Sequence, residues 1–114
     1  LARQQELPLH LPQLHHAALQ PLSQQILMGQ GLDLELNDWA MQLAVNPKTL
    51  QRWFVRDTGM TFGKWRQQAR LLTAIQRLAL GHSVLEVALE VGYNTPSAFS
   101  AMFRRQFGVS PSEW

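Results

Sequence analysis

WAMQLAVNPKTLQRWFVRDTGMT, residues 39–61, recurs in altered form as VALEVGYNTPSAFSAMFRRQFGVS, residues 87–110. The two stretches align at an offset of 48 residues, which becomes 49 after one additional residue at Thr95. The alignment pairs Ala40 with Ala88, Leu43 with Val91, Asn46 with Asn94, Pro47 with Pro96, Leu50 with Phe99, Phe54 with Phe103, Arg56 with Arg105, and Gly59 with Gly108. Matches of this kind at one offset indicate a supersecondary unit that occurs twice.

Each copy has the local signals of a helix-turn-helix. A short apolar helix and a tight turn are followed by a second helix that starts at a proline, where the missing N–H has no intrahelical partner to lose. Glycine follows the last turn of that second helix, as is common at helix ends. The small residues Ala40 and Ala88 would let the second helix pack closely across the first. No segment alternates with period two, so we expect no strands.

A long helix is predicted between the two copies, from Thr61 to Leu80. At 1.5 Å per residue its length would be about 30 Å. Successive major-groove faces of B-DNA lie about 34 Å apart, so this helix could place both units on one side of a duplex. Its apolar side would hold the units together. Its basic side, Arg66, Arg70, Thr73 and Arg77, could face either phosphate or water, with water favoured for Arg77.

The remaining segments complete an all-α fold of two helix-turn-helix subdomains joined by a long connecting helix. Apolar spacing predicts a helix over residues 13–28, with a kink or late start at Pro21, and Asn37 is the expected N-cap of the next one. We therefore divide the chain into four parts. These are a linker or lead-in (residues 1–12), the first subdomain (residues 13–60), the connecting helix (residues 61–80) and the second subdomain (residues 81–114).

Positive charge is concentrated in the middle of the chain. The whole chain of 114 residues carries a formal net charge of only +2, with a pI near 9.7. Between Pro47 and Arg77, however, there are seven lysines and arginines and a single acid, Asp57. A cationic segment in a nearly neutral chain is expected when one face must attract a polyanion such as nucleic acid.

Composition argues against several other classes of protein. With no cysteine there is no disulfide and no thiolate nucleophile, and the four histidines lack a metal-binding spacing. We expect no catalytic residues, no metal and no cofactor. We also expect no membrane span or signal peptide, so a cytoplasmic location is the default. The start at Leu1 rather than methionine suggests a piece of a longer protein.

The helix that starts at Pro47 would carry the main DNA-contacting residues. Leu50, Trp53 and Phe54 fall on one side of it, and Lys48, Gln51, Arg52 and Val55 fall on the other. Arginine can bind guanine through two donors, and glutamine can pair with adenine, in the major groove. A polar face of an amphipathic helix is often only solvated surface, and the repeated motif is what favours DNA contact here.

The helix that starts at Pro96 has a different outward face, formed by Ser97, Ser100, Ala101 and Arg104. Serine and alanine offer at most one hydrogen bond or a methyl contact, so we expect this helix to discriminate bases loosely. Arg104 and Arg105 are better placed for phosphate contacts, which add affinity without sequence information. An ordinary charged surface is the alternative for both arginines.

With both units in view, the chain resembles the AraC/XylS family from about Gln13 to its end. The residues that carry the resemblance are Leu50-Gln51-Arg52-Trp53-Phe54, Thr58-Gly59-Met60-Thr61-Phe62, Arg70-Leu71, Val87-Ala88-Leu89 through Val91-Gly92-Tyr93, Phe99-Ser100-Ala101-Met102-Phe103-Arg104-Arg105 and Phe107-Gly108-Val109-Ser110-Pro111. The resemblance implies about seven helices and promoter binding as a transcription activator or repressor. It also implies an N-terminal effector or dimerisation domain missing from this chain.

The resemblance also implies roles for individual residues. Base contacts would come from Lys48, Gln51 and Arg52 in the first unit and from Ser97, Ser100 and Ala101 in the second. Phosphate contacts would come from Asn46, Thr49, Arg56, Thr95, Arg104 and Arg105. Double-stranded DNA is the expected partner, with RNA polymerase as a candidate second partner.

The alternative function is a helical protein-interaction module that does not bind DNA. Four tryptophans, Trp39, Trp53, Trp65 and Trp114, could anchor a protein partner. The spacing of the first three instead predicts core positions. Salt separates the two functions, because binding through phosphates weakens steeply as salt rises and an apolar interface responds little.

Overall fold

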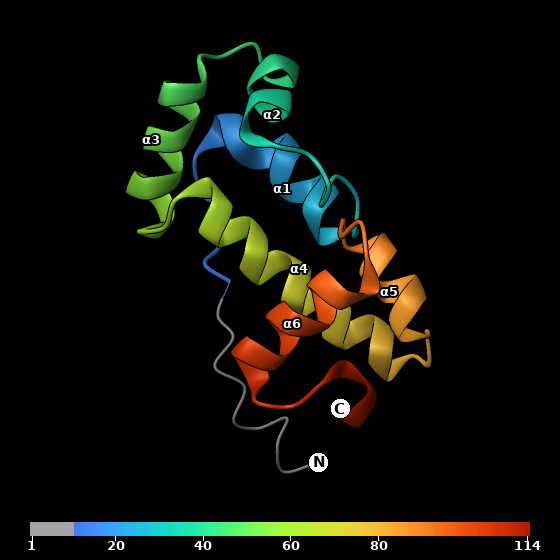
Figure 1. Ribbon diagram of the computed structural model, residues 1–114. Coiled ribbons are helices and arrows are strands. Elements are labelled where there is room, and N and C mark those ends of the chain that lie inside the picture. Colours follow the sequence, from blue (N-terminus) through green and yellow to red (C-terminus); the bar gives the residue numbers. More distant parts are fainter. Residues whose placement is uncertain (1–10) are drawn as a thin grey trace.

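The computed structural model describes residues 11–114, and these residues form helices and connecting segments without strands (Figure 1). The six α-helices are α1 (Gln20–Leu27), α2 (Leu36–Gln42), α3 (Pro47–Thr58), α4 (Phe62–Ala79), α5 (Val84–Glu90) and α6 (Pro96–Phe107). Two short 3-10 helices, η2 (Ala17–Leu19) and η3 (Pro111–Glu113), lie near the two ends of this range. The predicted all-α fold with a long connecting helix is confirmed.

Helix α4 lies between two groups of helices. Figure 1 shows α1, α2 and α3 toward the start of α4, and α5 and α6 toward its end. It contributes to a hydrophobic core that residues of both groups share: Trp65 packs edge-on against Phe54 of α3 at 5.4 Å between ring centroids, and Leu71 and Ala74 are buried. Although α4 has 18 residues, no described helix is long and apolar enough to cross a membrane.

The two helix-turn-helix units have the same backbone hydrogen bonds. In the turn after α2, the N–H of Val45 donates to the Ala40 carbonyl at 3.0 Å. In the turn after α5, the N–H of Tyr93 donates to the Ala88 carbonyl at 2.9 Å. Both alanines are buried at the crossing of the paired helices. The repeat inferred from the sequence is therefore a repeat of structure.

Helices α3 and α6 begin and end alike. Each has 12 residues, a proline at its start and a glycine with positive φ at its end, Gly59 at 75° and Gly108 at 78°. The cap before the proline differs, because Asn46 caps α3 and Thr95 caps α6. Thr95 is the additional residue of the alignment, so the insertion lengthens the turn and leaves the helix unchanged.

The helix predicted over residues 13–28 begins later, with η2 at Ala17 and α1 at Gln20. The preceding residues are held by tertiary hydrogen bonds. The Asp57 carboxylate accepts the backbone N–H groups of His15 (2.7 Å) and His16 (3.0 Å). These bonds occupy donors near the predicted start of the helix, and Pro21 fits only near the beginning of a helix. The predicted lead-in, residues 1–12, lies outside the described residues except for its last two.

Helix α2 begins earlier than its predicted cap. The Asp38 carboxylate accepts the backbone N–H of Glu35 at 2.8 Å, and the first helical residue is Leu36. Asn37 therefore lies inside the first turn, and the prediction that it is the N-cap was wrong. An acidic side chain in the first turn is favourable because it faces the positive end of the helix dipole.

The tryptophans pack mainly inside the molecule. Trp39 and Trp65 are buried, as their spacing predicted. Trp53 is half-buried, and the ring of His16 stacks on it at 4.3 Å between centroids. Trp114 is also half-buried and contacts Phe103 and Phe107. These contacts leave little tryptophan surface for a protein partner.

Candidate nucleic-acid interface

The outward face of α3 presents three cations. Lys48, Arg52 and Arg56 are exposed, whereas Leu50 and Phe54 on the opposite side are buried. Within residues 11–114, the side chains of these cations form no hydrogen bond or ion pair. Their charges are therefore free to bind an anion, and all N–H donors of the Arg52 guanidinium group remain available.

Gln51 is placed differently from its neighbours on α3. Its side chain is half-buried, and its Oε1 accepts the backbone N–H of Phe62 at 2.6 Å. Phe62 is the first residue of α4, so the bond satisfies an N–H that has no partner within its own helix. Pairing with adenine uses both the oxygen and the nitrogen of the amide. While this bond persists, one of the two lone pairs of the Gln51 oxygen is occupied, which restricts how the amide can face a base.

The outward face of α6 has shorter side chains and less charge at its centre than the outward face of α3. Ser97 and Ala101 are exposed and Ser100 is half-buried. Of the two arginines that follow, Arg104 lies 3.5 Å from the Glu113 carboxylate, whereas Arg105 has no side-chain partner among the described residues. This face therefore offers hydroxyl and methyl groups at its centre and one unpaired cation at its edge.

Three of the predicted phosphate-contacting residues lie at the starts of α3 and α6. Asn46 Oδ1 accepts the Lys48 N–H at 2.8 Å, and Thr95 Oγ1 accepts the Ala98 N–H at 3.1 Å. Thr49, in the first turn of α3, is half-buried. The capping bonds use side-chain oxygens, so the Asn46 amide nitrogen and the Thr95 hydroxyl proton remain free to donate. Helix starts also carry the positive end of the helix dipole, which favours an anion such as phosphate.

The arginines on the basic side of α4 have partners within the protein. Arg66 donates to the Leu34 carbonyl at 2.8 Å and to the Glu35 carboxylate at 3.1 Å. Arg77 pairs with Glu90 at 3.2 Å, which corrects the prediction that it meets only water. The partners lie in the loop between α1 and α2 and at the end of α5. These arginines therefore connect elements of the protein.

Arg70 connects the two subdomains directly. Its Nε donates to the Leu32 carbonyl at 2.8 Å, and its guanidinium lies 4.9 Å from the centre of the Tyr93 ring. Burial lowers the pKa of Arg70 from its ordinary value, and the nearby charge of Arg66 lowers it further. A carbonyl and an aromatic face compensate part of the cost of burying the cation. Leu32 belongs to the first subdomain and Tyr93 to the second.

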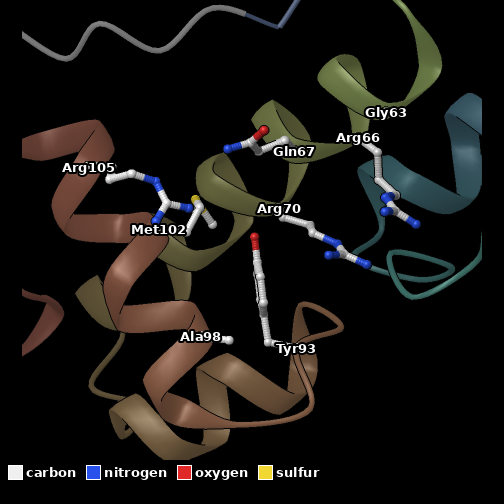
Figure 2. A pocket seen from close by; sticks show the side chains of 8 residues that line it. All are labelled: Gly63, Arg66, Gln67, Arg70, Tyr93, Ala98, Met102 and Arg105. Atoms are coloured by element: carbon white, nitrogen blue, oxygen red, sulfur yellow. The ribbon is translucent and has the colours of Figure 1, made fainter.

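A hollow of about 350 Å³ lies between α4 and α6, next to this contact (Figure 2). Gln67 extends into it from α4 and Arg105 extends toward it from α6, while Tyr93 rises between the two helices. Of these three residues, the sequence analysis assigned a DNA contact only to Arg105. The signal for Gln67 was weak, because one polar residue on a mixed helix face is usually solvated surface.

Taken together, the fold and this surface define the class. Figure 1 shows α3 and α6 on the same side of their partner helices, α2 and α5, as expected for a double helix-turn-helix domain with two outward recognition helices. A family model described as a helix-turn-helix domain matches residues 39–114. The chain belongs to the AraC-type helix-turn-helix family.

Named relatives are bacterial regulators. The chain is 33% identical over 114 residues to the HTH-type transcriptional regulator NimR of Escherichia coli, which covers 100% of this chain and 42% of NimR. It is also 36% identical to the HTH-type transcriptional regulator RipA of Corynebacterium glutamicum. That alignment of 89 residues covers 77% of this chain and 27% of RipA. The chain thus spans less than half the length of these relatives.

Solved structures share the fold over most of the chain. One is the C-terminal domain of AraT, a response regulator from Geobacillus stearothermophilus, with a TM-score of 0.74, 30% identity and coverage of 85% of this chain and 82% of that one. Another is the DNA-binding domain of the global transcriptional factor AdpA in complex with a target DNA. It has a TM-score of 0.70, 27% identity and coverage of 91% and 89%.

Proposed function

We propose that this chain is the DNA-binding domain of a transcription regulator, with α3 and α6 entering adjacent major-groove segments of one promoter site. The observation that carries the proposal is the outward face of α3, where Lys48, Arg52 and Arg56 are exposed without partners among the described residues. Exposed, unpaired cations on one helix face can neutralise DNA phosphates, and the counterions released from the DNA favour binding. The DNA complex of the related AdpA domain supports the same assignment.

Most direct base readout is assigned to α3. Arg52 can bind guanine through two donors, and Lys48 can donate to the same acceptors as a point charge. Gln51 stays a predicted base contact, through its amide nitrogen or after its bond to Phe62 breaks. Ser97, Ser100 and Ala101 of α6 supply weaker contacts, because their groups are short.

Phosphate contacts are assigned to both ends of the recognition helices. Those at the helix starts are Asn46, Thr49 and Thr95, and those near the helix ends are Arg56, Arg104 and Arg105. Arg104 would have to leave Glu113 to bind phosphate, so we expect it to contribute less than Arg105. These contacts provide affinity for any duplex and set the register of the protein on the DNA.

The whole protein is proposed to act in the bacterial cytoplasm, with an N-terminal effector or dimerisation domain and with RNA polymerase as a second partner. The coverage of NimR and RipA leaves room in such regulators for a further domain. Nothing in these proposals requires a cofactor or a catalytic residue.

The experiment is a selection of bound sequences from randomised duplexes, followed by affinity measurements over a salt series. We expect enrichment of a site with one well-defined segment, contacted by α3, and one degenerate segment about one helical turn away. Affinity should fall steeply with salt, since each neutralised phosphate adds about 0.9 to the slope of log K against log salt. No binding to any duplex at low salt, together with salt-insensitive binding to a protein, would favour the interaction-module alternative.

A further inference from the structure

The hollow between α4 and α6 lies beside the outward face of the second recognition helix. Arg105 at its edge follows Ala101 by four residues, which places the two side chains close together on one side of α6. The first turns of α4, on the other wall, are joined to α3 by the bond between Gln51 and Phe62. The hollow therefore lies between α6 and the part of α4 that is joined to α3.

The charges around the hollow are unequally compensated. Arg66 is paired with the Glu35 carboxylate, so that pair is nearly neutral. Arg70 donates to a carbonyl and lies over the Tyr93 ring, and neither partner carries a negative charge. Arg105 has no ion-pair partner among the described residues. Two positive charges thus remain on the walls without a matching acid.

Free donors point into the same space. Figure 2 shows the Gln67 amide extending from α4 toward α6 and the Arg105 guanidinium extending from α6 toward α4. Both side chains are exposed, and neither forms a hydrogen bond with another described residue. Side-chain N–H donors beside a fixed positive charge form a suitable site for a phosphate oxygen, because bonds between ionised groups are the strong ones.

We propose that this hollow binds a DNA backbone phosphate from the segment that lies between the two major-groove segments contacted by α3 and α6. Gln67 and Arg105 donate to the phosphate, and buried Arg70 supplies a positive charge that cannot swing away. The connecting helix is then part of the DNA-binding surface as well as a spacer. This inference rests on the proposed function and adds Gln67 to the residues that contact phosphate.

Gln67→Lys and Gln76→Lys form a matched pair of test variants. Both glutamines are exposed residues of α4, and nine residues at 100° per residue place them on opposite sides of the helix. Each variant adds the same positive charge to α4, so any difference in DNA binding between them is due to the side of the helix that carries the charge. Arg105→Gln is the third variant, and thermal unfolding of every variant checks that its fold is retained.

Binding to a mixed-sequence duplex of about two helical turns is measured by fluorescence anisotropy over a salt series, because phosphate contacts do not depend on sequence. Gln67→Lys should steepen the slope of log K against log salt by about 0.9 and tighten binding at low salt about threefold or more. Arg105→Gln should make the slope shallower by about 1. Gln76→Lys should leave both quantities close to those of the unmodified chain.

The outcomes separate the hollow from the proposed function. Equal slopes for Gln67→Lys and Gln76→Lys, in a chain that binds the duplex, would overturn the phosphate site and leave DNA binding intact. Failure of the unmodified chain to bind any duplex at low salt would overturn the proposed function itself. A shallower slope for Arg105→Gln alone, without an effect of Gln67→Lys, would place the phosphate on α6 outside the hollow and would also overturn the proposal.

Discussion

The side-chain oxygen of Gln51 accepts a 2.6 Å hydrogen bond from the backbone N–H of Phe62 and so joins α3 to the first turn of α4. At the equivalent positions of the second unit, 49 residues later, stand Ser100 and Pro111. Proline has no N–H to donate, so this bond has no counterpart there. Helix α3 is thereby fixed to α4 by a contact that α6 lacks.

Gln51→Ala is expected to lower the free energy of unfolding by about 1 kcal/mol, because it leaves the Phe62 N–H without its acceptor. Gln51→Glu keeps an acceptor beside the N-terminus of α4, where negative charge is favourable, and should retain stability. Urea unfolding followed by circular dichroism measures both. Gln24→Ala, at an exposed position on α1, is the control and should change stability by no more than about 0.5 kcal/mol. Equal losses in both Gln51 variants would contradict a role for the bond.

Arg52→Ala should cost about 1–3 kcal/mol on the selected site and relax the preference at one base pair. The reason is geometric: Arg52 is exposed on the outward face of α3 and its fork has no partner within the described residues. Competition binding on the selected duplex and on single-base variants measures the effect. Equal losses on the selected and on a random duplex would identify Arg52 as a phosphate contact instead.

The helices could be predicted from the sequence because their signals are local. Asn46-Pro47 and Thr95-Pro96 mark the starts of α3 and α6, and Gly59 and Gly108 mark their ends. Each signal acts within one or two residues of its position, so one sequence suffices to recognise it.

The partners of the α4 arginines could not be predicted in this way. Arg66, Arg70 and Arg77 have the spacing of a solvated or phosphate-binding stripe. Their partners include backbone carbonyls of the loop between α1 and α2, more than 30 residues away in sequence. Every residue has a backbone carbonyl, so the sequence does not indicate which carbonyl accepts a hydrogen bond from an arginine. Only the tertiary fold shows this. The hydrogen bond of Gln51 could not be predicted for the same reason, because its donor is the backbone N–H of Phe62.

The turns of the two units are expected to respond differently to substitution. Ala44 and Gly92 are equivalent and both have positive φ, 55° and 98°. A Cβ on Gly92 would lie 3.0 Å from both the Asp33 Cα and the Leu32 oxygen, whereas Ala44 is exposed. Gly92→Ala should therefore destabilise by more than the roughly 1–2 kcal/mol that left-handed backbone alone costs an alanine. Ala44→Gly should be neutral or stabilising by up to about 1 kcal/mol, because it relieves that cost.

Thermal and urea unfolding of the two turn variants test this contrast. The physical difference is the neighbouring backbone, because Gly92 packs against the loop of the first subdomain whereas Ala44 is exposed. If Gly92→Ala and Ala44→Gly both changed the free energy of unfolding only slightly, the loop of the first subdomain would have to shift to accommodate the new methyl group.

Ala101→Arg tests whether α6 meets the groove. Ala101 lies at the centre of the exposed face of α6, and arginine there adds a donor fork that can bind guanine. Selection from randomised duplexes should then return a defined base in the segment that is degenerate for the unmodified chain. An unchanged selected sequence, with affinity raised equally on all duplexes, would place α6 against phosphate only.

Arg70 is expected to control the spacing between the two contacted DNA segments. Its hydrogen bond to Leu32 and its contact with Tyr93 join the subdomains at one buried point, and Gly92 packs beside it. Arg70→Met removes the charge and the donor with a small change of shape, and it leaves the Leu32 carbonyl without that partner. We expect a loss of about 1–3 kcal/mol of stability from the unpaired carbonyl.

The distinguishing measurement is affinity on duplexes in which the two segments are moved apart or together by one or two base pairs. Each base pair changes both the distance and the rotation between the segments, so a rigid pair of recognition helices should bind one spacing best. Arg70→Met should flatten this preference, because the subdomains can then reorient. Arg66→Met is the matched control, since its bonds to Leu34 and Glu35 do not reach the second subdomain. If Arg70→Met weakened binding equally at every spacing, Arg70 would contribute to stability or to the charge of the phosphate site without influence on spacing.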